Sequence, residues 1–201
     1  MKTIKKGRPK TFNKHNAENI AMHAYWREGM DNISLNEICR KIGESKPSVY
    51  REYGGEEGLK ASALKLYLDK RVNVLSEYLF GDKPFIENLG SALNFLVNSH
   101  FDDNNSYPCL YNKESWFPSK TMSAECKSII YDKDKEILFN LKNRLTEAIE
   151  LGEISIEVDI DIFISYIHHQ LKLIATLSSN KVSKDILNGM VSLILEPLKK
   201  N

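Results

Sequence analysis

A predicted pair of short helices between Ser34 and Leu59 restricts the fold more than any other feature of this sequence. Ser34 and Glu37 form the S-x-x-E pattern of a capping box, so a helix is expected to begin at Leu35. The residues of its buried face follow i, i+3, i+4, i+7 spacing and are Leu35, Ile38, Cys39 and Ile42. The pattern predicts a helix of about two turns.

Gly43 ends this helix and a second one follows directly. Glycine adopts the left-handed conformation that closes a helix, and Ser45 caps a second helix over residues 46–53, whose first turn tolerates Pro47. Val49 and Tyr53 form its apolar side. Two helices joined in this way predict a helix-turn-helix, which places its second helix in the major groove of DNA.

The same residues resemble the TetR family of bacterial transcriptional regulators, over roughly residues 7–59. The matching positions are Ser34, Gly43, the run Ser45-Lys46-Pro47-Ser48-Val49-Tyr50, Tyr53, and the run Glu56-Glu57-Gly58-Leu59. Glu56 stands where the family usually has Lys, and Glu44 stands where it usually has an aliphatic residue. The first departure removes one expected phosphate contact.

The resemblance implies DNA contacts from the second helix and its surroundings. The candidate DNA-binding residues are Arg8, Ser34, Ser45, Lys46, Ser48, Tyr50 and Arg51. Arg8 lies in a basic arm whose Lys-Gly-Arg-Pro-Lys run resembles an AT-hook, which inserts its arginine into a narrow minor groove. The alternative is a solubilising tail.

Charge is distributed unevenly along the 201 residues. Residues 1–60 contain 12 basic and 8 acidic side chains, a net charge of +4, whereas the remainder contains 16 and 19, a net charge of −3. A basic head on an acidic body suits a DNA-binding module joined to a regulatory domain. We therefore expect a flexible arm at 1–12, a helix-turn-helix domain at 13–55 and a regulatory domain at 56–201.

Helical periodicity continues through the rest of the chain, and only residues 154–158 are ambiguous. The expected helices are 14–28, 56–79, 85–101, 119–151, 160–177 and 184–199. The fold class is therefore predicted to be all-α, with a three-helix head joined by a linking helix to a helical body.

The last two helices carry more apolar surface than one small core covers. In the TetR family this pair forms a four-helix interface with a second subunit, which implies a homodimer on a palindromic DNA site. The expected interface residues are Ile167, Leu171, Ile174, Leu187, Met190, Val191 and Ile194. The alternative is a larger internal core.

Members of the TetR family usually bind a small-molecule effector among the middle helices, so the resemblance also implies such a site here. The candidate pocket residues are aromatic or polar side chains on apolar segments: His100, Phe101, Tyr111, Trp116, Phe117, Phe139, Tyr166 and His168. The cysteines Cys39, Cys109 and Cys126 lack metal-ligand spacing, so no metal and no cofactor is expected.

These features together predict a repressor that a small-molecule effector releases from double-stranded DNA. One alternative is a helix-turn-helix adaptor without an effector, and another is a helical enzyme, although we find no catalytic motif of the common kinds. The sequence has no apolar run near 18 residues and no secretory signal, so we expect a cytoplasmic protein with no membrane association.

Overall fold

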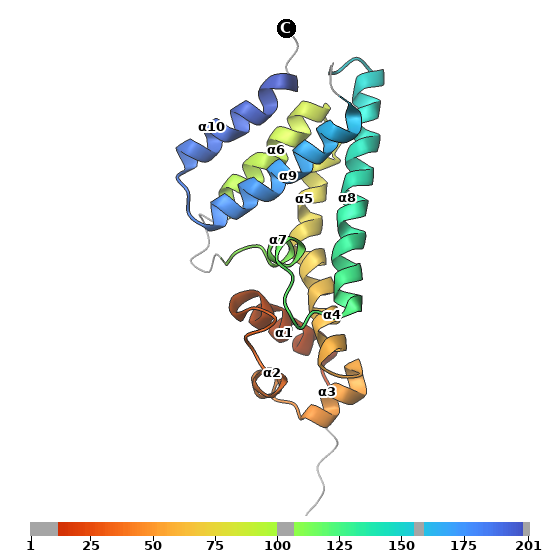
Figure 1. The fold of residues 1–201 in the computed structure, drawn as a ribbon, viewed down its shortest axis with the longest axis vertical. Helices are drawn as coiled ribbons and strands as arrows, with labels where there is room; N and C mark the ends of the chain where they lie inside the picture. The colour runs from red at the N-terminus through yellow and green to blue at the C-terminus, as the bar shows by residue number, and fades with distance from the viewer. Residues whose placement is uncertain (1–11, 100–106, 155–158, 199–201) are drawn as a thin grey trace, which may run out of the picture.

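The computed structural model describes residues 12–99, 107–154 and 159–198. All regular elements in these ranges are helices, which confirms the all-α prediction. The helices form an elongated molecule, with three short helices at one end and a bundle of longer helices at the other (Figure 1).

The head consists of α1 (Lys14–Glu28), α2 (Leu35–Ile42) and α3 (Lys46–Tyr53). The capping signals predicted at Ser34 and Ser45 are confirmed, because each side chain accepts a backbone N–H at a helix start, and Asn13 caps α1 in the same way. The Ser34–Glu37 capping box is complete, because Glu37 also accepts the backbone N–H of Ser34. Gly43 ends α2 in the left-handed conformation.

The head has an apolar centre that the helical spacing predicted. The four residues expected on α2 are all buried, together with Ala17, Ala21, Ala24 and Tyr25 of α1. From α3 only Val49 is buried, so most of that short helix faces solvent. Its stability therefore depends on packing against α2 and α4 (Glu56–Tyr67) rather than on its own length.

Residues 56–79 were predicted to form one regular linking helix, but the structure interrupts it. It comprises α4, a π-helical segment η1 (Leu68–Val72) and α5 (Asn73–Leu79). α4 packs against α1, α3 and α8, whereas α5 packs against α6, so the π segment separates the half that carries the head from the half held by the body. A π segment depends on tertiary packing and leaves no periodic signature in a sequence this short.

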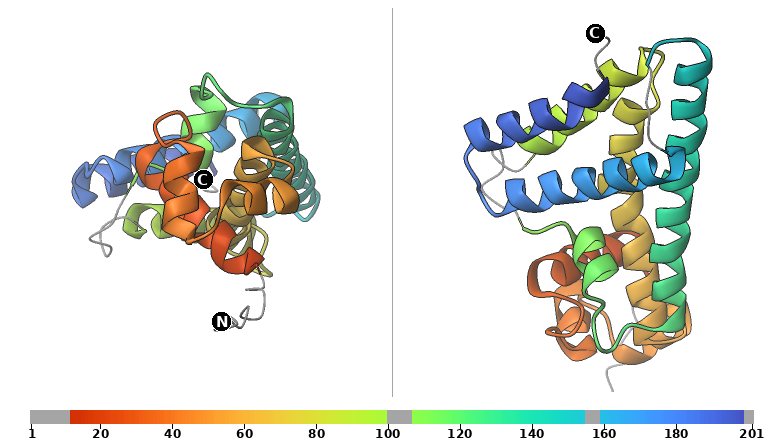
Figure 2. Two further views of the ribbon diagram at one scale, coloured as in Figure 1. Left: turned by 90° about the horizontal axis from the view of Figure 1, so that it is seen from below. Right: turned by 45° about the horizontal axis from the view of Figure 1, so that its top comes forward.

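The body is built from α6 (Phe85–Asn98), α7 (Leu110–Trp116), α8 (Ala124–Glu150), α9 (Ile160–Ser179) and α10 (Lys184–Leu195), followed by a 3-10 turn, η2 (Glu196–Leu198). α6, α9 and α10 pack together, and α8 runs along the length of the body as far as α4 (Figures 1 and 2). The helix predicted to begin at residue 119 begins at Ala124, because the side chain of Ser123 caps it. The predicted end of α6 at Phe101 lies outside the described residues.

The structure corrects the predicted dimer surface. Six of the seven residues expected there are buried within the single chain: Ile167, Leu171, Ile174, Leu187, Val191 and Ile194. They lie on the faces of α9 and α10 that pack against each other and against α6, and Met190 is half-buried at the edge. The apolar side chains that these two helices leave exposed are Ile162, Tyr166, Ile186 and Leu193.

None of the helices in the described ranges combines the length and the hydropathy needed to cross a bilayer.

Candidate functional site

The exposed side of α3 carries polar side chains at the far end of the head. Lys46, Tyr50 and Arg51 are exposed, and 54% of the Tyr50 side chain is accessible to solvent. Ser48 is half-buried, and its hydroxyl lies 2.9 Å from that of Ser45. The three exposed side chains therefore present two cationic groups and one phenol, which are groups that contact DNA phosphates and bases. The two serines instead stabilise the start of the helix.

The carboxylate of Glu56, at the family's usual lysine position, has a local partner. The Nζ atom of Lys60 lies 3.1 Å from carboxylate oxygens of both Glu56 and Glu57, which precede it by about one helical turn. Lys60 is only 2% exposed and also donates to the hydroxyl of Thr121. The negative charge that the sequence places beside α3 is thus partly neutralised by a buried lysine, which the sequence comparison with the family did not anticipate.

Arg8 lies outside the described residues. Ser34 lies at the start of α2, where its hydroxyl donates to Glu37 and accepts the Glu37 N–H.

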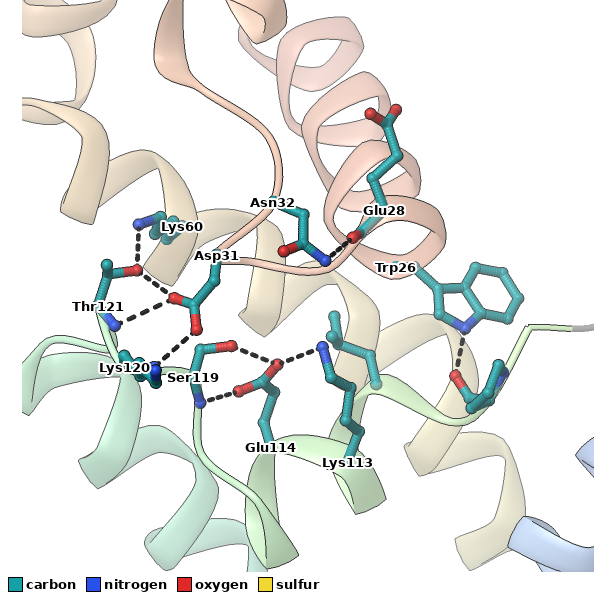
Figure 3. Close-up of polar contacts among 12 residues, drawn as sticks. Trp26, Glu28, Asp31, Asn32, Lys60, Lys113, Glu114, Ser119, Lys120 and Thr121 are labelled. Atoms are coloured by element: carbon teal, nitrogen blue, oxygen red, sulfur yellow. Dashed lines mark hydrogen bonds and ion pairs between the residues drawn. The ribbon is translucent and has the colours of Figure 1, made fainter.

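A polar contact between head and body surrounds Asp31 (Figure 3). The Asp31 carboxylate accepts the backbone N–H groups of Lys120 and Thr121, at 2.7 and 3.1 Å, and the Thr121 hydroxyl at 2.6 Å. The hydrogen bond from the Thr121 side chain is the main cause that lowers the pKa of Asp31. Asp31 therefore holds the turn between α7 and α8 against the turn between α1 and α2.

A buried carboxylate shapes the same turn from the body side. Glu114 is 1% exposed and accepts the backbone N–H and the hydroxyl of Ser119, at 2.7 and 2.8 Å, while Lys113 Nζ lies 3.4 Å away. At the other end of α7, just before its first residue, the indole N–H of Trp26 donates to the carbonyl of Pro108 at 2.9 Å (Figure 3). α7 therefore lies between the head and α9, and is held at both of its ends (Figure 2, right).

A small cavity of about 70 Å³ lies where the π segment, α6, α7, α8 and α9 meet. Its walls are mainly apolar, with a few polar groups, and consist of Arg71, Val72, Leu75, Leu96, Cys109, Tyr111, Asn112, Ile137, His168, Leu171, Lys172 and Ala175. An apolar cavity with convergent polar groups is the usual form of a small-molecule site.

Of the predicted effector residues that the structure describes, two line this cavity, Tyr111 and His168. The predicted residues Trp116, Phe117, Phe139 and Tyr166 are exposed and do not line it. α7 turns Tyr111 and Asn112 inward, so the aromatic residues at its end face solvent, and α8 directs Ile137 rather than Phe139 to the cavity. His100 and Phe101 lie outside the described residues.

A charged network borders the cavity at Asp134 of α8. Its carboxylate accepts from the Tyr111 hydroxyl, from Ser115 Oγ at 3.1 Å and from Lys172 Nζ at 2.6 Å. Burial raises the pKa of Asp134, but contacts with His168, Lys172 and Tyr111 outweigh burial and hold that pKa well below its usual value. Asp134 is therefore a carboxylate that compensates the charge of the buried Lys172.

Cys109 also lines the cavity, where it accepts a hydrogen bond from the Tyr67 hydroxyl at 3.4 Å. Burial raises the pKa of the Cys109 thiol, which favours the unreactive protonated form. No group of three or more His, Cys, Asp or Glu side chains in the described part of the chain is placed to hold a metal ion.

Sequence comparison gives short matches to two regulators. No protein-family model matches the chain. It is 30% identical over 82 residues to the HTH-type transcriptional repressor ComR of Escherichia coli K12, which is 41% of this chain and 39% of ComR. It is also 30% identical over 87 residues to the repressor BdcR of the same organism, which is 43% of this chain and 44% of BdcR. The chain thus matches about two fifths of the length of these relatives.

Solved structures match over almost the whole chain. A cysteine mutant of the TetR family regulator CifR, in complex with operator DNA, has a TM-score of 0.78 at 21% identity, over 94% of this chain and 98% of CifR. Reduced NemR of E. coli has a TM-score of 0.78 at 14% identity, over 93% and 98% of the two chains. A TetR regulator of Chloroflexus aurantiacus has a TM-score of 0.75 at 16% identity, over 90% and 91%. At these identities the comparison establishes a common fold.

Proposed function

We propose that this chain, which has the fold of the TetR family of transcriptional regulators, is a repressor that binds a palindromic operator as a homodimer. The observation that carries the proposal is the exposed face of α3, where Lys46, Tyr50 and Arg51 project from a helix-turn-helix. Both curated relatives are named as transcriptional repressors, which also disfavours the enzyme alternative.

In the proposed complex α3 enters the major groove, and its three exposed side chains contact bases and phosphates. Tyr50 donates its hydroxyl to a phosphate, and Lys46 and Arg51 contribute positive charge. Ser34 and Ser45 act through the helix starts that they cap, where free backbone N–H groups favour a phosphate. The basic arm with Arg8 follows the adjacent minor groove.

A second copy of the chain is proposed to cover the exposed apolar side chains of α9 and α10. Ile162 and Tyr166 are four residues apart on α9, and Ile186 and Leu193 are seven apart on α10, so each pair lies on one side of its helix. Exposed apolar patches of this kind mark association surfaces. A homodimer formed there places its two heads at the ends of α4, away from the interface (Figure 1).

The cavity beside the π segment is the proposed effector site. Val72 and Arg71 of that segment line the cavity, and the segment joins the halves of the linking helix that contact head and body. A ligand that binds better when the heads are misplaced lowers operator affinity by its differential affinity for the two states. An adaptor without an effector would show no such coupling.

The experiment is operator binding by recognition-helix variants. Duplexes selected by the protein from a random pool serve as operators, and affinity is measured by fluorescence anisotropy at fixed salt. Tyr50→Ala and Lys46→Ala are expected to weaken binding by roughly 1–3 kcal/mol each, because each removes a base or phosphate contact.

Tyr131→Ala and Lys127→Ala, exposed positions of the same residue types on α8, are the matched controls and should bind as the wild type does. Wild-type affinity in both α3 variants would refute the assignment of α3 as the recognition helix.

A further inference from the structure

The walls of the cavity carry two cationic side chains, of which one has a carboxylate partner and the other has none among the described residues. Arg71 and Lys172 line it, and its lining includes no Asp or Glu. The charge of Lys172 is compensated by Asp134, 2.6 Å from its Nζ atom. Arg71 is exposed to solvent and has no carboxylate partner among the described residues, so its guanidinium can pair with an anionic ligand at the cavity.

Other cations surround Arg71 at the junction of head and body. Burial lowers the pKa of the His23 imidazole, and the nearby charges of Arg27, Arg71 and Lys70 lower it further. His23, Arg27 and Lys70 do not line the cavity, so among these side chains only Arg71 can contact a ligand held in it. A guanidinium at the wall attracts an anion and repels an amine.

The cavity wall also contains a buried polar atom that makes no hydrogen bond in the described structure and has only a long contact with the Asp134 carboxylate. His168 is 5% exposed, and its Nε2 atom is buried without a hydrogen bond in the described structure. The nearest carboxylate oxygen, Asp134 Oδ1, lies 3.4 Å away outside hydrogen-bond geometry. A buried ring nitrogen left in this state favours a ligand that carries a polar group.

Arg71 connects the cavity directly to the head. Its guanidinium lies over the indole ring of Trp26 in α1, 4.5 Å from the ring centroid, and Trp26 also packs edge-on against Tyr67 of α4. Arg71 belongs to the π segment, the least regular part of the linking helix. A group that draws Arg71 toward the cavity therefore removes a contact between the linking helix and α1.

We propose that the cavity binds a short-chain carboxylate and that Arg71 recognises the charge of this ligand by leaving the Trp26 ring. The inference rests on the proposed function, because it names the chemical class of the effector for that site. The acyl chain occupies the apolar walls formed by Val72, Leu75 and Leu96, and the carboxylate accepts hydrogen bonds at the polar side.

The size of the cavity restricts the ligand and explains the response. A cavity of about 70 Å³ is roughly half the volume of one that holds benzene. A four-carbon carboxylate has as many heavy atoms as benzene, so it enters this cavity only by separating the π segment from α7 and α9. The state with a displaced π segment binds the ligand better, as release of the operator requires.

The test uses butyrate, its uncharged isostere butyramide, and cationic butylamine, which has the same number of carbons. Binding to the full chain carrying Trp116→Phe is followed by calorimetry and by the emission of Trp26, which is then the single tryptophan. Butyrate is expected to bind at millimolar concentration, at least about five times more tightly than butyramide, and to shift the Trp26 emission. Butylamine is expected not to bind.

Arg71→Gln should remove the preference for butyrate over butyramide. The matched control is Arg27→Gln, because Arg27 also lies over an aromatic ring, that of Tyr107, but does not line the cavity. Equal affinities for butyrate and butyramide, failure of butyrate to bind, or an unchanged preference in Arg71→Gln would each overturn the inference.

Operator affinity, measured separately, distinguishes the two proposals. Intact operator binding together with no butyrate binding defeats the carboxylate inference alone. Butyrate binding with the Trp26 shift, in a protein that binds no operator, supports the carboxylate site and defeats the proposed function.

Discussion

At the scale of single residues, the charge of Asp134 determines whether a buried lysine is tolerated in the body. Lys172 is 6% exposed, and Asp134 is its carboxylate partner among the described residues. Removing one member of a buried ion pair leaves the other charge uncompensated, which costs more than the pair itself contributes.

Asp134→Asn is therefore expected to lower the free energy of unfolding by about 3 kcal/mol, the low end for such pairs, because 23% of the Asp134 side chain reaches solvent. Urea unfolding at pH 7 measures the effect. The control is Asp132→Asn on the same helix, whose exposed carboxylate accepts only from Ser128 among the described residues.

The effect of Asp134→Asn should depend on pH in one direction. The pKa of Asp134 is lowered on folding from its ordinary value of 3.8, so its stabilisation is fully present above about pH 4 and is lost as the pH falls through the lower folded value. A difference between wild type and variant that grows on acidification would contradict this assignment.

Residue positions on one helix were predictable, whereas partners distant in the chain were not. Helical spacing correctly placed Lys46, Tyr50 and Arg51 on the exposed side of α3. Asp31 contacts residues 89 and 90 positions later, and no local pattern specifies such a pairing. Aromatic side chains at the end of α7 were expected in the pocket but do not line the cavity beside the π segment, because composition does not give the rotation of a short helix.

At the scale of elements, the junction of α3 and α4 depends on close backbone approach at Gly58. A Cβ atom at this position would lie 1.8 Å from the carbonyl oxygen of Tyr53. Backbone cannot move aside as a flexible side chain does, so the helices must separate if the residue is larger.

Gly58→Ala is expected to destabilise the protein by about 2 kcal/mol or more, as overpacking does, and to weaken operator binding because α3 loses its position. Thermal unfolding and anisotropy measure the two effects. Gly90→Ala in α6 is the matched control: its Cβ would contact Leu195 at an ordinary 3.5 Å, so it should be neutral or stabilising by up to about 1 kcal/mol. A Gly58 variant as stable as the Gly90 variant would contradict the packing argument.

Two helix starts in the head followed from local chemistry, whereas the start of α8 at the cap Ser123 did not. Ser34 and Ser45 each begin a helix as predicted, because the capping hydroxyl and the first turn lie within four residues. The π segment at Leu68–Val72 was not predicted, because its cause is packing between distant helices. That segment joins the two halves of the linking helix and lines the cavity, so the sequence did not predict this wall of the proposed effector site.

At the scale of the whole molecule, α9 and α10 leave apolar side chains exposed that a homodimer would cover. Leu193 is 73% exposed, whereas its neighbour Ile194 is 2% exposed. A charge at Leu193 therefore meets solvent in the monomer and would meet an apolar surface in the proposed dimer.

Leu193→Glu is expected to convert the dimer to a folded monomer, because an unpaired charge buried in an interface costs several kcal/mol. Light scattering reports the mass and circular dichroism reports the fold. Leu151→Glu, at an exposed apolar position after α8, is the control and should remain dimeric. A dimeric Leu193 variant would place the interface elsewhere.

The hydrogen bonds from Lys120 and Thr121 to Asp31 limit how freely the parts of this protein can be exchanged. A biosensor built by grafting residues 13–55 onto a foreign body would strip Asp31 and the Trp26 indole of their partners at Lys120, Thr121 and Pro108. The head is therefore not expected to keep its structure when it is joined to an unrelated body. A working chimera has to carry the segment 107–123 with it, or supply an equivalent turn.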